Sequence, residues 1–290
     1  MEKIDLHKID KPEAVTMYYD SIKDYFEENV SGCKRKFSYL YYTYKDFSEL
    51  LELSVIKKSE LSQQKNWFTY GLNCISEFCR LAHFPDEVKE AQIDNSGSYS
   101  IKVEETNQHI NILKALSMAT IARDEGKQKI IANSPLYLWE LKEEDYDNGN
   151  FVTYFFLLMK EYYTQKTFDK DLFEKSQQDL ISIKSEIGPD IKKKFWIYYM
   201  NKSLIALKSL ADDNETEFNQ NLIEAIKAHQ EVWSQKKALN RGGTPLCREN
   251  EGFLSWNCTA LAAMAHDKGW KLEVESDYMP SFMVDGSINK

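Results

Sequence analysis

Apolar residues recur at helical spacing along most of the chain. Between residues 59 and 82 they occupy the i, i+3 and i+4 positions of one helix face, and residues 215–239 repeat that pattern. Residues 253–268 are apolar around most of the helix circumference, which is typical of a buried helix. The same periodicity predicts further helices at residues 13–30, 37–53, 107–125, 150–166, 169–187 and 191–211.

The breaks between these helices are short. Gly188-Pro189-Asp190 and Asp212-Asp213-Asn214 separate long amphipathic helices, and such links predict antiparallel helical hairpins. Gly126 and Gly269 are predicted to end helices as C′ residues, and Asn133-Ser134-Pro135 is predicted to cap and start another. The fold class that follows is all-α, a multi-helix bundle of stacked antiparallel helical hairpins.

Two segments depart from the helical pattern. Residues 91–106 are polar and contain Asn-Ser-Gly-Ser, so they are predicted to be a loop and a possible boundary within a single helical domain over residues 1–290. After Gly269, apolar and charged residues alternate, which predicts a short extended C-terminal tail. No period of 34 residues or similar is present, so regular helical repeats are not supported.

The charge of the chain changes which partners are expected. The 46 acidic and 37 basic residues of the 290 give a net charge of −9. An acidic surface repels phosphate backbones and anionic membranes, so neither nucleic acid nor a membrane is an expected partner. It would suit a basic protein, although solubility alone accounts for the same charge.

The ends and the cysteines indicate the compartment. Charged residues interrupt the N-terminus at once, and the longest apolar stretch, residues 151–159, is too short to span a bilayer. The cysteines are an odd, scattered set without paired zinc spacing: Cys33, Cys74, Cys79, Cys247 and Cys258. Free buried thiols and a cytoplasmic location are therefore predicted.

The strongest enzyme signal is the pair His266-Asp267. It resembles the His-Asp motif of HD-type metal-dependent phosphohydrolases, in which an upstream His and a downstream Asp complete the metal site. His229 is a possible upstream ligand, but on its apolar helix face it is predicted to be a hydrogen-bonded core residue. Asp277 and Asp285 lie near the chain end, where that family continues with further helices. The alternative interpretation is a helix C-terminus with Gly as its cap, and this interpretation is favoured.

Three other motifs are weaker. Asp212 to Glu217 resembles the Asp-rich motif of terpene synthases, but a second metal motif is missing, so helix capping is favoured. The Asp-rich stretches that start at Asp94 and Asp145 lack the Gly that a calcium loop needs at its sixth position. Gly242-Gly243-Thr244 is not followed by the Lys of a phosphate loop. The sequence therefore predicts no catalytic, cofactor-binding or metal-binding residue.

A resemblance to a known family covers residues 200–284. One predicted helix contains Ala228 and His229 near its end, followed by Trp233. The next long helix runs from Thr259 to Gly269 and is rich in small residues. The chain then continues with Ser276-Asp-Tyr278-Met-Pro280. This order resembles the immunity protein 49 family of bacterial polymorphic toxin systems. The resemblance implies a mostly helical protein that protects its producer by binding a cognate toxin, with no cofactor and no catalytic residues.

An acidic run is the predicted partner-binding site. Glu143, Glu144, Asp145 and Asp147 would meet a toxin that is itself basic, and opposite charges would speed association. Two other functions stay open at this point: a helical-hairpin scaffold or adaptor similar to tetratricopeptide proteins, and the HD-type phosphohydrolase.

Overall fold

The computed structural model describes most of the chain. The described residues are 1–9, 11–94, 97–106, 108, 110–139, 151–186, 191–236, 238 and 244–289.

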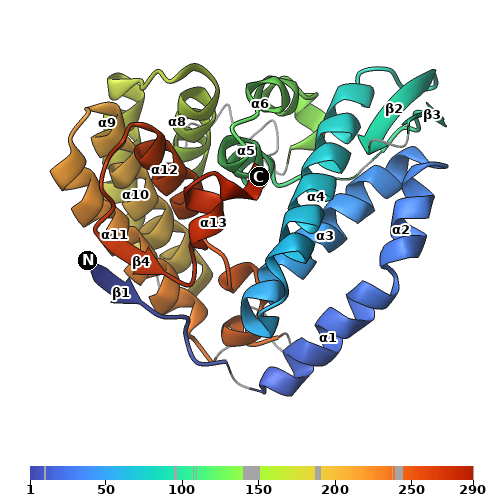
Figure 1. Ribbon diagram of the computed structural model, residues 1–290. Coiled ribbons are helices and arrows are strands. Elements are labelled where there is room, and N and C mark those ends of the chain that lie inside the picture. Colours follow the sequence, from blue (N-terminus) through green and yellow to red (C-terminus); the bar gives the residue numbers. More distant parts are fainter. Residues whose placement is uncertain are drawn as a thin grey trace.

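Two helical arms meet at the centre of the molecule (Figure 1). The first arm contains α1 (Pro12–Asp24), α2 (Phe26–Cys33), α3 (Phe37–Lys57) and α4 (Leu61–Leu81). The second arm contains α8 (Phe151–Gln165), α9 (Lys170–Glu186), α10 (Ile191–Ala211), α11 (Glu215–Trp233) and α12 (Trp256–Asp267). Between the arms lie α5 (Ile112–Ile121) and α6 (Glu125–Ala132). Short 3₁₀ turns occur at η1 (Leu136–Leu138), η2 (Leu246–Arg248), η3 (Asn250–Gly252) and η4 (Ser287–Asn289).

The all-α prediction is confirmed, and the long helices form hairpins as expected. α3 and α4 are joined by residues 58–60, and α10 and α11 by residues 212–214. One hydrophobic cluster runs through both arms, from Ile4 to Ile288, and includes α12, whose apolar residues are buried all round. A smaller cluster lies between α1, α3 and α4, with Phe253 at its edge. Burial of these faces, rather than helix propensity, stabilises helices of this length.

Four predicted helix boundaries are wrong. The helix predicted over residues 215–239 is α11, which ends at Trp233. Residues 13–30 are interrupted at Tyr25, which separates α1 from α2. Residues 107–125 contain only α5, because a second helix, α6, starts at Glu125 with the Asp124 carboxylate accepting from the N–H of Lys127. Gly126 therefore lies in the first turn of α6 and is not a C′ residue. Pro135 precedes only the 3₁₀ turn η1, not a longer helix.

The segment 91–106 is not the predicted loop. It contributes to an antiparallel hairpin of β2 (Val88–Asp94) and β3 (Gly97–Lys102). Ala91, Ile93 and Ile101 are buried, and the Asn73 side chain of α4 donates to the carbonyl of Ile93 at 2.8 Å. Few apolar residues alternate here, so the strand pattern was hidden among polar residues. The possible domain boundary at this segment stays a prediction.

The extended tail after α12 is confirmed. β4 (Val274–Ser276) pairs in parallel with β1 (Glu2–Ile4), and the Ser276 hydroxyl donates to the carbonyl of Ile4. A short helix, α13 (Ser281–Val284), follows. Within the described part of the chain, no helix is both long enough and apolar enough to cross a membrane.

Candidate functional site

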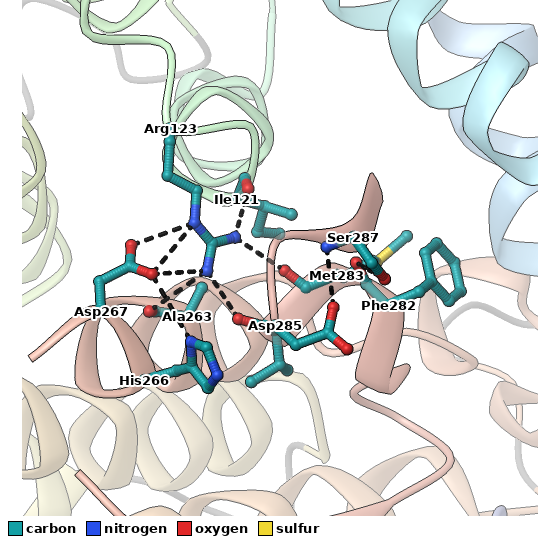
Figure 2. Close-up of polar contacts among 10 residues, drawn as sticks. Ile121, Arg123, Ala263, His266, Asp267, Phe282, Met283, Asp285 and Ser287 are labelled. Atoms are coloured by element: carbon teal, nitrogen blue, oxygen red, sulfur yellow. Dashed lines mark hydrogen bonds and ion pairs between the residues drawn. The ribbon is translucent and has the colours of Figure 1, made fainter. Parts of the chain in front are cut away.

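Arg123 joins three segments that are distant in the sequence. It follows α5 in the left-handed backbone region (φ 55°). Its guanidinium donates to the carbonyl oxygens of Ile121, Met283 and Val284 at 2.6, 3.0 and 2.6 Å. It also donates to both carboxylate oxygens of Asp267 at 2.9–3.3 Å (Figure 2). A guanidinium has five donors in a rigid fork, so one side chain ties the ends of α5, α12 and α13 together.

The His266-Asp267 pair, which resembles the HD-type metal motif, lies in this cluster, and its contacts are structural. Asp267 is occupied by Arg123, and the His266 Nδ1 atom lies 3.7 Å from the same carboxylate. No group of three His, Cys, Asp or Glu side chains among the described residues is arranged to hold a metal ion. The favoured interpretation of the pair as a helix end is confirmed, because Gly269 has φ 79° and its N–H donates to the carbonyl of His266.

The Asp-rich link before α11 also has a structural role. Asn214 accepts from the N–H of Glu217 at 3.1 Å and so caps the helix, as predicted. Asp212 forms ion pairs with Lys208 at 2.5 Å and with Lys170 at 3.2 Å. The hydrogen bond from Lys208 is the main cause that lowers the pKa of Asp212.

The prediction that His229 is a core residue is confirmed. The residue is 2 % exposed, and its Nε2 lies 3.1 Å from the carbonyl oxygen of Gly252. A carbonyl can only accept, so Nε2 carries the proton and Nδ1 is an unprotonated acceptor. Burial lowers the pKa of His229 to about 3, which keeps the ring neutral. Trp233, Trp256 and Tyr278 are likewise buried.

The five cysteines are free and buried, as predicted. Burial raises the pKa of Cys79 to about 12 and that of Cys258 to about 11. A thiol is reactive as its thiolate, so these two groups are inert near neutral pH.

The predicted partner-binding residues Glu143, Glu144, Asp145 and Asp147 lie outside the described residues. Their role stays a prediction.

An exposed apolar surface lies where α4 leads into the β2–β3 hairpin. We call it the hairpin-end surface, and it consists of Phe84, Val88, Leu136 and Tyr137, which are 36, 66, 54 and 51 % exposed. The Tyr137 hydroxyl donates to the carbonyl of Ala82 at 2.9 Å, which fixes η1 beside the end of α4. Scattered exposed apolar residues are ordinary, but neighbouring large ones with a tyrosine are typical of protein contact sites.

Acidic residues border this surface. Asp86, Glu87, Glu104 and Glu105 are all exposed, and hydrogen bonds join Val103 to Asp86 and Glu87. Burial raises the pKa of Tyr137 most strongly, and the charge of the Glu105 carboxylate raises it further. Lys89 lies over the Phe84 ring, 4.2 Å from its centroid, and pairs with Glu87. Sequence reasoning missed the surface because it is assembled from a hairpin and a 3₁₀ turn that were not predicted.

Comparison with known proteins gives one family. A family model described as Immunity protein 49 matches residues 59–283, which is more than half of the chain. The match includes the hairpin-end surface and extends well before residue 200, where the sequence resemblance begins. Searches of the curated proteins and of the solved structures give no significant match.

Proposed function

The chain belongs to the immunity protein 49 family, and from that membership we propose that it binds a cognate bacterial toxin and neutralises it without catalysis. The family match is the observation that carries the proposal. A role as a stoichiometric inhibitor needs a rigid binding surface and no reactive group. The cytoplasmic location predicted from the sequence belongs to the same proposal.

The hairpin-end surface supports a specific contact site. Its aromatic and aliphatic side chains supply the apolar centre of an interface, and tyrosine is frequent among residues whose truncation costs most binding energy. The surrounding carboxylates favour a basic partner, because opposite charges accelerate encounter. We therefore propose that a basic surface of the toxin contacts the hairpin-end surface first.

Two experiments test the proposal together. Co-expression with the toxin encoded beside this gene is expected to restore growth, and the purified proteins are expected to form a stoichiometric complex. The proposal fails if the neighbouring gene product neither poisons cells nor binds this chain.

A matched pair of tyrosines tests the surface. Tyr137→Ala is expected to weaken the complex by about 2 kcal/mol, or roughly 30-fold, as measured by isothermal titration calorimetry. Tyr198 on α10 is similarly exposed, at 45 %, and lies in the other arm. Tyr198→Ala is the control and should leave affinity unchanged. An equal loss of affinity in the two variants would show that the interface does not lie at the hairpin-end surface.

A further inference from the structure

The β2–β3 hairpin has two outer edges, and they differ in how they are covered. A strand at the edge of a sheet presents backbone N–H and C=O groups with which another chain can pair. Within the described part of the chain, β2 and β3 form a two-stranded sheet with no third strand. Figure 1 shows this hairpin at the far end of the first arm, beside α4.

The outer edge of β2 is covered by side chains of α4. The Arg80 guanidinium donates to the carbonyl of Glu90 at 2.5 Å, and the N–H of Gln92 donates to the Glu77 carboxylate at 3.1 Å. Backbone groups that already have partners cannot pair with an incoming strand. The edge of β2 is therefore closed.

The register shows which groups of β3 face away from β2. The N–H of Val103 donates to the carbonyl of Glu87 at 2.8 Å, so this pair is hydrogen-bonded. Hydrogen-bonded and non-hydrogen-bonded pairs alternate along an antiparallel ladder, so Ile101 and Tyr99 also bond to β2. The residues between them turn their backbone groups to the open side. The same alternation turns Glu90 of β2 outward, where α4 contacts it.

The open edge of β3 thus consists of Ser98, Ser100 and Lys102. All three residues are exposed. Among the described residues, no other element supplies a hydrogen bond to their backbone groups. Exposed backbone groups of this kind form a template for strand addition.

Protective devices are sparse on this edge. Lysines, prolines and bulges commonly keep edge strands from pairing. β3 is six residues long and holds one lysine and no proline. The irregularity in the register lies at the turn end, between Ala91 and Asp94. A regular strand of ordinary length is therefore available for a partner.

The charge around the hairpin indicates the occupant. Residues 86–105 contain six acidic and two basic residues, a net charge of −4. Two copies of this chain that met edge to edge would bring these like charges together, which is unfavourable. A basic segment would instead meet opposite charge, above all at Glu104 and Glu105, which are exposed just beyond β3.

The open edge also continues into the hairpin-end surface. Val88 of that surface lies opposite Lys102, the last residue of β3. A segment paired along β3 would therefore reach the apolar side chains at its end.

We propose that an extended, basic segment of the toxin pairs with β3 and adds a third strand to the hairpin. The outward N–H and C=O groups supply the main-chain hydrogen bonds, and the acidic residues around the hairpin select the charge of the segment. This pairing rests on the proposed toxin-binding function and specifies the conformation and the charge of the partner segment.

Amide hydrogen exchange, measured by NMR on the full chain, tests the pairing residue by residue. In the free protein, the amides of Ser98, Ser100 and Lys102 are expected to exchange fast, while those of Tyr99 and Ile101 are protected. In the complex with the purified product of the neighbouring toxin gene, exchange of the outward amides is expected to slow at least ~10-fold. A complex that leaves their exchange rates unchanged would overturn the proposal.

A proline at an outward position tests the same edge through affinity. Ser100→Pro removes an N–H that the hairpin does not use, and its ring obstructs an added strand. We expect it to weaken the complex at least ~10-fold in isothermal titration calorimetry. Ser100→Ala is the matched control, because it loses the hydroxyl that donates to Glu90 but keeps the backbone N–H. Equal affinities of the two variants, with circular dichroism melting showing both folded, would overturn the proposal.

Charge reversal tests the chemistry of the segment. Glu104→Lys is expected to slow association with the toxin at least ~3-fold in stopped-flow measurements. Glu174 on α9 is also exposed and lies in the other arm. Glu174→Lys changes the net charge equally and should leave the association rate closer to that of the original protein. Equal rates for the two variants would overturn the assignment of a basic segment.

The outcomes separate this pairing from the proposed function. If the complex forms while the outward amides stay unprotected, strand pairing fails and toxin binding stands. If no complex forms, both fail. If the outward amides are already protected in the free protein and analytical ultracentrifugation shows a dimer, a second copy occupies the edge, and the toxin segment is overturned.

Discussion

Single side chains hold together parts of this molecule that helix packing alone would leave loose. Arg123 satisfies carbonyl oxygens at the ends of two helices and pairs with Asp267 on a third. Helix ends leave carbonyl groups without partners, and a buried carbonyl without a donor is costly. The same contact engages the Asp267 carboxylate of the His266-Asp267 pair, which resembles a metal motif in the sequence.

Removal of the Arg123 guanidinium should loosen the C-terminal segment. We expect Arg123→Met to lower the free energy of unfolding by about 2–4 kcal/mol, because several buried carbonyls lose their donor. Urea denaturation followed by circular dichroism measures the loss. Asp267→Asn is the control and should cost under about 1 kcal/mol, since its side chain is 47 % exposed and the carbonyl contacts persist. Similar costs for both variants would show that the ion pair, not the carbonyl contacts, matters.

Asp46 should make stability depend on pH in an unusual direction. Burial, followed by the charge of Glu49, raises the pKa of this carboxyl to about 6, although Lys45 and a hydrogen bond from Asn29 oppose the shift. A carboxyl whose pKa is higher in the folded than in the unfolded protein stabilises the fold below its unfolded pKa. That contribution is lost as the pH rises from about 4 to about 6.

Asp46→Asn removes this titration. We expect the variant to be more stable than the original protein by about 1–2 kcal/mol at pH 7.5 and equally stable at pH 4. The full shift of the pKa from 3.8 to about 6 corresponds to ~3 kcal/mol, and partial exposure of the side chain reduces it. Urea denaturation at each pH gives the free energy of unfolding of both proteins. The difference between the two proteins isolates Asp46, because His229 also titrates at acid pH and contributes equally to both. A difference that does not change with pH would show that Asp46 is not the group responsible.

At the scale of elements, periodicity identified the long helices because their apolar faces are wide. α4 and α12 were predicted almost to their ends, since each buries residues over its whole length. The region between α4 and α8 was predicted poorly. Its helices are short. The cap at Asn111 starts α5 later than predicted, and the cap at Asp124 starts a second helix, α6. Capping residues are common in loops, so their positions became informative only with the tertiary contacts.

The candidate sites were harder to predict than the fold. The hairpin-end surface depends on the contact of Tyr137 with Ala82, 55 positions apart, and no local pattern marks either residue. The correct prediction that His229 is a hydrogen-bonded core residue gave no sign that one ring nitrogen would lack a partner. Tertiary structure alone reveals which polar atoms are satisfied.

At the scale of the whole molecule, both arms share one hydrophobic cluster, which passes through α5 and α12. We expect a single unfolding transition, in which the calorimetric and van't Hoff enthalpies agree. Differential scanning calorimetry tests this, with tryptophan fluorescence as an independent probe. Two resolved transitions would instead place a domain boundary in the chain, and residues 91–106 would be the first candidate.

The pairing of β1 with β4 has a consequence for biosynthesis. Partners in this small sheet are 272 positions apart. At ~5–20 residues per second, a ribosome needs tens of seconds to add the chain between them. During that time the β1 strand stays on the nascent chain without its partner strand β4. Under the proposed function, a toxin-binding fold would be complete only after translation ends, so protection of the producing cell would lag behind synthesis of this protein.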